Sequence, residues 1–156
     1  MQSSRSKINI PKIVPPEGEA ELNVDKIVRI GTDIDREFKR QAALYAWVSN
    51  NYALASSNVR QLKNEMELLV AGLSAAARDS LKKAGENKPV KEQVYNWVIE
   101  QKKYQEKFGD LENAKLVEDQ LQGLLRALDH KRDALVGLGA NYRAEMAGEL
   151  SMRRKD

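Results

Sequence analysis

The chain contains no cysteine and a single histidine among its 156 residues. The lack of cysteine excludes disulfide bridges and thiolate metal sites. His130 stands alone next to a charge run that includes Lys131 and is expected to be solvated, so it is interpreted as a surface residue and not as a metal ligand. Aromatic residues make up only 6% of the chain, whereas charged residues make up 31%. This balance is typical of helical bundles and coiled coils, and less so of an enzyme with a broad apolar core.

Catalytic and membrane motifs are missing as well. No glycine-rich phosphate loop follows a predicted strand, and no Ser-His-Asp arrangement can be assembled around the one histidine. No apolar run reaches membrane-spanning length, and residues 1–16 lack the apolar core of a signal peptide. We therefore expect a cytoplasmic protein, without metal or cofactor, that binds a partner and is not an enzyme.

Proline is scarce and concentrated near the N-terminus. Three of the four prolines, Pro11, Pro15 and Pro16, lie within the first 23 residues. Because proline interrupts helices and termini are often poorly ordered, residues 1–23 are predicted to form a flexible arm. The alternative is an extended tether to a neighbouring subunit.

Apolar side chains recur every seven residues between residues 24 and 84. One track is Phe38, Tyr45, Tyr52, Val59, Met66 and Leu73, and a second, offset by three or four residues, has Gln41 as its one polar member. Two such tracks make one apolar stripe along a helix. The pattern predicts one very long helix, or two laid end to end, with Asn23 as N-cap and Gly85 as C-cap.

A second long helix is predicted from residue 110 to residue 152, after a short helix from residue 90 to about residue 107. Its seven-residue track is Ala114, Leu121, Leu128, Leu135 and Tyr142. A bend or frayed end is expected after Gly139. The predicted fold class is all-α: residues 24–156 form a long helical hairpin with a short connecting helix, coiled-coil-like packing and an oligomeric state.

Residues 68–77 contain no charge. A helix that is apolar on all sides is buried on all sides, and one small chain cannot easily surround it. We therefore expect other copies to cover it, through Leu69, Gly72, Leu73 and Ala76. The alternative is an ordinary hairpin core with an alanine-rich outer face.

A basic cluster follows this segment at once. Arg78, Lys82 and Lys83 lie near the predicted helix end, with Lys88 and Lys91 beyond the turn. The cluster is compatible with an anionic partner, although cations at a helix C-terminus also suit the helix dipole and the net charge is only +3.

The order of these segments resembles a known family. The residues that carry the likeness are Leu44-Tyr45, Trp47-Val48-Ser49-Asn50, the stretch from Arg78 to Gly85, and above all Lys131-Arg132-Asp133-Ala134-Leu135 and its continuation to Glu145. Over about residues 24–147 the chain resembles the UvsY-like recombination mediators of bacteriophages. The fit is poorest in the proline-rich arm and in residues 89–108.

The resemblance implies a ring-like homo-oligomer, larger than a dimer, that binds single-stranded DNA. It also implies two protein partners, a RecA-like recombinase that the mediator loads and the single-strand-binding protein that it displaces, in the host cytoplasm if the chain is phage-encoded. By analogy, Arg78 is the first position expected to contact DNA phosphate, with Lys82 and Lys83 beside it and Lys88 and Lys91 as auxiliaries. Tyr95, Trp97 and Tyr104 could stack on bases, but their spacing is more typical of a packing face. The competing hypothesis is a structural or scaffolding helical phage protein with no nucleic acid role, which the weak net charge favours.

Overall fold

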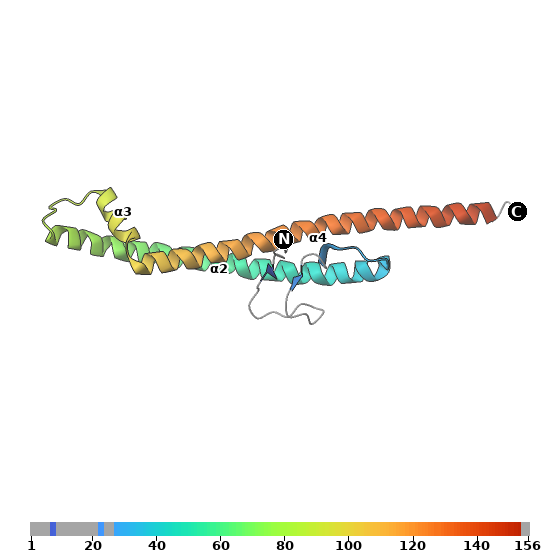
Figure 1. The fold of residues 1–156 in the computed structure, drawn as a ribbon, viewed down its shortest axis with the longest axis horizontal. Helices are drawn as coiled ribbons and strands as arrows, with labels where there is room; N and C mark the ends of the chain where they lie inside the picture. Colours follow the sequence, from blue (N-terminus) through green and yellow to red (C-terminus); the bar gives the residue numbers. More distant parts are fainter. Residues whose placement is uncertain (1–6, 9–21, 24–26, 154–156) are drawn as a thin grey trace, which may run out of the picture. The chain divides into compact units, whose positions relative to one another are not determined.

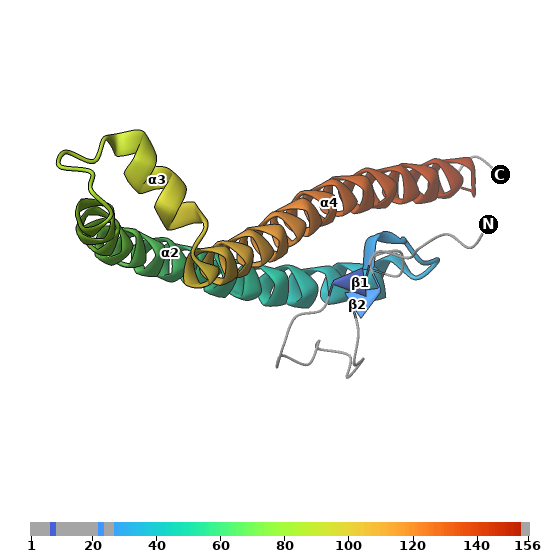
Figure 2. The same cartoon turned by 60° about the vertical axis from the view of Figure 1, so that its left-hand side comes forward.

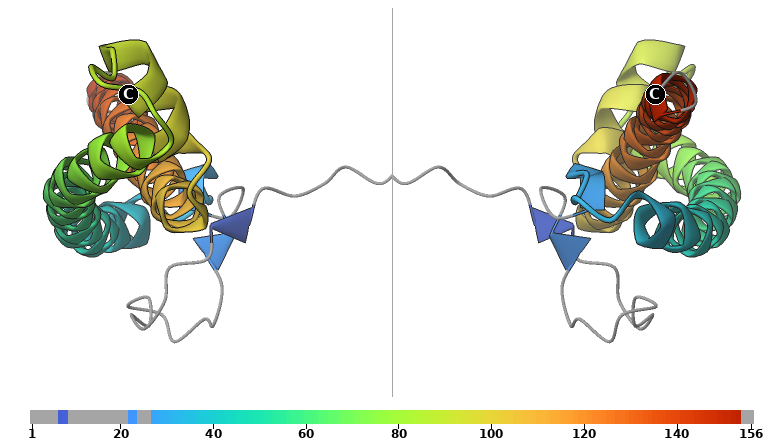
Figure 3. Two further views of the ribbon diagram at one scale, coloured as in Figure 1. Left: turned by 90° about the vertical axis from the view of Figure 1, so that its left-hand side faces the viewer. Right: turned by 90° about the vertical axis from the view of Figure 1, so that its right-hand side faces the viewer.

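The computed structural model describes residues 7–8, 22–23 and 27–153. Three helices, α2 (Ile34–Lys83), α3 (Lys91–Ile99) and α4 (Lys102–Arg153), account for most of this part (Figure 1). Two short strands, β1 (Lys7–Ile8) and β2 (Leu22–Asn23), pair antiparallel and lie side by side (Figure 3). The predicted all-α class is confirmed. The rest of the predicted arm, residues 1–6 and 9–21, lies outside the described residues.

The start of α2 differs from the prediction. Asn23 belongs to β2, and the first long helix begins only at Ile34. Its cap is Asp33, whose side-chain Oδ1 accepts a hydrogen bond from the backbone N–H of Arg36 at 3.0 Å. By residue type, Asn23 and Asp33 are both good N-caps. The apolar seven-residue pattern begins only after Asp33, and residues 29–33 are not helical.

The end of α2 is the one predicted. Gly85 has φ +101°, a left-handed conformation that strains any residue with a Cβ. The backbone N–H of Gly85 donates to the carbonyl of Lys82 at 3.1 Å, and that of Glu86 donates to the carbonyl of Leu81 at 3.0 Å. These two bonds satisfy carbonyls that a helix end otherwise leaves unpaired. Gly85 is therefore confirmed as the C-cap.

The boundary between the short helix and the last helix was wrongly placed at Gly109 and Asp110. The break falls at residues 100–101, and Gly109 lies inside α4. Gln101 accounts for it: its backbone N–H donates to the carbonyl of Val98, its side-chain amide donates to the carbonyl of Trp97 at 2.9 Å, and its own carbonyl accepts the first bonds of α4. α4 stays helical to Arg153, so the bend or frayed end expected after Gly139 is absent from its described residues.

Two compact units divide the chain. The first unit comprises residues 1–52 and 119–156, and the second unit comprises residues 53–118. In the first unit the buried apolar residues of α4 include three members of the predicted track, at positions 121, 128 and 135, all with no exposed surface. The buried face of α2 there is Glu37, Gln41, Leu44, Val48 and Asn51. The predicted aromatic track is off this face, because Phe38 and Tyr45 lie partly exposed at its edge.

The second unit buries two apolar clusters. One comprises Val59, Leu111 and Ala114, with Leu62 packed on it. The other comprises Ala77, Val94 and Val98, with Val70, Leu73, Leu81, Trp97 and Tyr104 packed on it. α3 turns back over the C-terminal part of α2 to make the second cluster (Figure 2). The short connecting helix is therefore part of this core.

An ion pair in the second unit predicts a pH dependence of stability. Lys107 Nζ donates to Glu65 Oε2 at 2.9 Å. This hydrogen bond is the main cause that lowers the pKa of Glu65 and raises the pKa of Lys107. The stabilisation by Glu65 is therefore present above its unfolded pKa, about 4.3, and is lost as the pH falls through the lower folded pKa. The stabilisation by Lys107 is present below its unfolded pKa, about 10.4, and is lost as the pH rises through the higher folded pKa.

We expect Glu65→Gln to flatten the acid side of the stability curve. The free energy of unfolding from urea titrations should fall less between about pH 5 and pH 3 than in the unmodified protein. Glu106→Gln is the matched control, because Glu106 pairs with Lys102 on the exposed surface of α4, the helix that carries Lys107. An acid limb unchanged by Glu65→Gln would contradict the assignment.

Candidate nucleic-acid interface

Five cations surround the turn that joins α2 to α3 in the second unit. They are Arg78, Lys82 and Lys83 on α2, Lys88 in the turn and Lys91 at the start of α3. All are exposed, and within the described residues none of their side chains forms an ion pair or a hydrogen bond. Residues 78–92 also hold three carboxylates, so five minus three leaves a local charge of +2. These side chains are free to bind an anion.

Helix geometry brings part of this set together. Arg78 follows the buried Ala77, and Lys82 lies one turn further along the same face of α2. On α3, Lys91 lies three residues before the buried Val94. Because α3 folds back over the C-terminal part of α2, side chains one step beyond the contact residues of each helix flank the same side of the contact, and so does a side chain three residues before a contact residue. Arg78, Lys82 and Lys91 therefore share one side, which we call the basic face.

Lys83 and Lys88 stand apart from the basic face. Lys83 is turned by about 100° from Lys82 around α2, since each helical residue rotates by that angle. Lys88 belongs to the exposed turn, where no helix fixes its direction. The sequence-predicted patch is therefore one face of three cations with two outlying members.

The predicted oligomerisation residues divide between the chain's own core and its surface. Leu73 packs against the cluster of Ala77, Val94 and Val98, and Leu69 is half-buried. Gly72 and Ala76 are exposed, and a Cβ at Gly72 would meet nothing within 4 Å. One face of residues 68–77 thus serves the hairpin core, as the alternative interpretation held. The other face is apolar, and the described residues leave it exposed: Leu68, Ala71, Gly72, Ala75 and Ala76.

The aromatic residues near the basic face are not equivalent. Trp97 and Tyr104 pack on the buried cluster, which confirms the packing interpretation for both. The ring of Tyr104 also stacks on that of Phe108, with centroids 6.1 Å apart. Tyr95 is different: it follows the buried Val94 and is 60% exposed. Its offset from the buried positions of α3 was the signal in the sequence that could have separated it from the other two.

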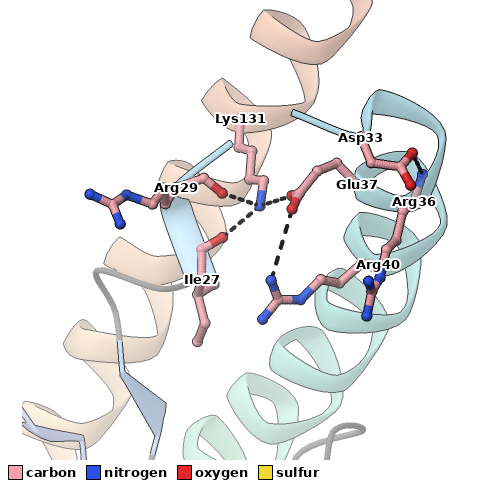
Figure 4. A network of polar contacts seen from close by, with 7 residues as sticks. All are labelled: Ile27, Arg29, Asp33, Arg36, Glu37, Arg40 and Lys131. Carbon is pink, nitrogen blue, oxygen red and sulfur yellow. Dashed lines mark hydrogen bonds and ion pairs between the residues drawn. The ribbon is translucent and has the colours of Figure 1, made fainter. Parts of the chain in front are cut away.

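The sequence placed Lys131 in a solvated charge run, but the structure buries it. Its side chain is 1% exposed, and Nζ forms an ion pair with Glu37 Oε2 at 2.7 Å. Nζ also donates to the carbonyls of Ile27 and Arg29, each at 2.9 Å (Figure 4). Within the first unit this ammonium joins α4, the start of α2 and the segment that precedes α2. Its role is structural, and the run at residues 131–135 that carries the family likeness serves the fold at Lys131 and the buried Leu135.

Comparisons with protein-family models, with curated proteins and with solved structures find no match for this chain. Among residues 27–153, no helix combines the length and hydropathy that crossing a bilayer requires. The described part of the chain also contains no cluster of three or more acidic or histidine side chains that could hold a metal ion. The resemblance to UvsY-like mediators therefore stands on the sequence motifs alone.

Proposed function

We propose that this protein is a non-enzymatic recombination mediator of the UvsY-like kind. It binds single-stranded DNA as a homo-oligomer and loads a RecA-like recombinase in place of single-strand-binding protein. The observation that carries the proposal is the basic face: Arg78, Lys82 and Lys91 are exposed, unpaired among the described residues, and adjacent to an uncovered apolar segment.

Phosphate binding needs cations and not a pocket. Each cation that neutralises a phosphate releases a counterion, so affinity falls steeply with salt. A local charge of +2 is weak in one copy, but a ring of copies repeats it along one strand and gains avidity without any strong single site. This explains how a chain of net charge +3 could bind DNA.

The second candidate is a scaffolding protein without a nucleic acid role, which the small net charge favours. A gel shift with a fluorescein-labelled single strand, repeated over a range of salt concentrations, separates the two. Binding with a negative slope of log affinity against log salt supports the mediator. No shift at low salt and micromolar protein would leave the scaffold as the better function.

Assembly is expected to depend on the uncovered apolar face of residues 68–77. Leu68 is 76% exposed, so Leu68→Glu should leave the fold of a single chain intact while placing a charge in the contact between copies, where an unpaired charge is costly. We expect light scattering at micromolar concentration to show an oligomer larger than a dimer that the variant dissociates.

The matched control is Leu116→Glu, which adds the same charge at another exposed leucine of the second unit. It should keep the mass of the unmodified protein. Leu73→Glu is a poor test, because Leu73 belongs to the chain's own core and its loss would also unfold the hairpin. A monomeric mass for the unmodified protein would refute the proposed assembly.

A further inference from the structure

We propose that Tyr95 is the base-contacting residue of this interface, so that the basic face binds unpaired nucleotides and not any polyanion. The inference rests on the proposed function and adds to it the residue that distinguishes single strands from duplex DNA. It starts from the exposure of Tyr95, which the packing of α3 does not explain.

The core of the second unit does not use Tyr95. α3 buries Val94 and Val98, and its other large aromatic residue, Trp97, packs against the same cluster. Tyr95 lies one residue past Val94, is 60% exposed, and forms no ring contact or hydrogen bond through its side chain within the described residues. Much of its ring surface is therefore available to a ligand.

The ring of Tyr95 lies beside the cations that would bind the phosphates of a nucleic acid strand. Lys91 lies four residues before Tyr95, so the two side chains are neighbours on one face of α3. Arg78 and Lys82 flank the same side of the contact between α2 and α3, because each helix presents there the residues one step beyond its buried positions. Tyr95 thus belongs to the basic face, whose cations lie on α2 (Arg78 and Lys82) and on α3 (Lys91).

A tyrosine among cations selects for unpaired bases by simple physics. The cations hold phosphates of any sequence, while the ring stacks on a base through its π-face and accepts every base. In a duplex both faces of each base are already stacked on neighbours, so the ring has no partner there. The arrangement therefore favours single strands without reading their sequence.

The test compares Tyr95→Ala with Tyr95→Phe on a fluorescein-labelled single strand. Tyr95→Ala should weaken binding about fivefold to 150-fold for each base that the ring stacks, and Tyr95→Phe should bind like the unmodified protein. Because no charge changes, the slope of log affinity against log salt should stay the same in both. Circular dichroism should show an unaltered fold, since Tyr95 is exposed.

The matched control is Tyr142→Ala, which removes a tyrosine of similar exposure, 58%, from α4 of the first unit. It should not change DNA binding. A second probe is an abasic strand of the same length, which keeps the phosphates and lacks the bases. The unmodified protein and Tyr95→Ala should bind this strand equally.

Two results would overturn the inference: Tyr95→Ala binding the normal strand within twofold of the unmodified protein, or losing as much affinity on the abasic strand as on the normal one. Failure of this inference is distinct from failure of the proposed function. If the unmodified protein binds single strands and only Tyr95→Ala has no effect, the inference alone falls. If the unmodified protein binds no strand at all, both fall.

Discussion

Replacing Arg78 and Lys82 together by alanine is expected to weaken single-strand binding strongly while leaving the oligomer intact. Each lost phosphate contact should lower the steepness of log affinity against log salt by about 0.7, so two contacts lower it by roughly 1.4 for each subunit that touches the strand. The loss repeats in every copy of a ring, so the total effect grows with the number of subunits in contact. Because phosphates carry no base information, binding should weaken uniformly across sequences.

The control is a second pair of exposed cations on the same helix. Arg36→Ala with Lys39→Ala removes the same two charges from α2, at its N-terminus, where cations do not favour the helix dipole. This variant should keep nearly the unmodified affinity and salt slope. If Arg78→Ala with Lys82→Ala binds like the unmodified protein, these residues are only dipole partners, and the contacts should be sought at Arg60 and Lys63 or in the last residues of the chain.

Lys131→Met is expected to destabilise the first unit strongly. The substitution keeps most of the side-chain volume but leaves Glu37 as a charge without its ion-pair partner on α4, and it frees two carbonyls, of Ile27 and Arg29. Breaking a buried ion pair in this way typically costs about 3–5 kcal/mol. Urea unfolding followed by circular dichroism, at one fixed protein concentration, would measure the loss.

The double variant Lys131→Met with Glu37→Leu separates the loss of the ion pair from the cost of leaving the Glu37 carboxylate without Lys131. Removing both charges eliminates a carboxylate that would otherwise keep only Arg40 as an ion-pair partner, at 3.9 Å, and exchanging a whole buried pair for apolar residues is often neutral. The double variant should therefore be more stable than Lys131→Met alone. A loss below about 1 kcal/mol for the single variant would mean that the pair behaves like an exposed one, contrary to its burial.

The elements of this fold were predictable where their signals are local. The end of α2 at Gly85 was visible because the helix needs a residue that tolerates positive φ there. The inward face of α4 was visible because leucines at positions 121, 128 and 135 repeat every seven residues. The break at residues 100–101 was not visible, because neither glycine nor proline marks it and the side chain of Gln101 makes the decisive hydrogen bond.

The candidate site was also predictable only in part. The cations from Arg78 to Lys91 stood out as a cluster in the sequence, but only the return of α3 over α2 adds Lys91 to the side of α2 that holds Arg78 and Lys82. Spacing alone grouped Tyr95 with Trp97 and Tyr104, whereas packing buries part of the last two and leaves Tyr95 exposed. The spacing did hold a signal, because Trp97 lies three residues after Val94 on one face of the helix, whereas Tyr95 is turned by about 100° from Val94.

By itself the sequence determined that the chain is helical, where most of its apolar stripe lies, and that no thiol or disulfide chemistry is available to it. Tertiary structure alone decided which charge goes inside. Lys131 and Arg132 are adjacent and both basic, yet Lys131 is buried and Arg132 is exposed. The physical reason is that an ammonium can be buried only where partners satisfy it. Those partners, Glu37 and two carbonyls, come from segments about 90 to 100 residues away in the chain.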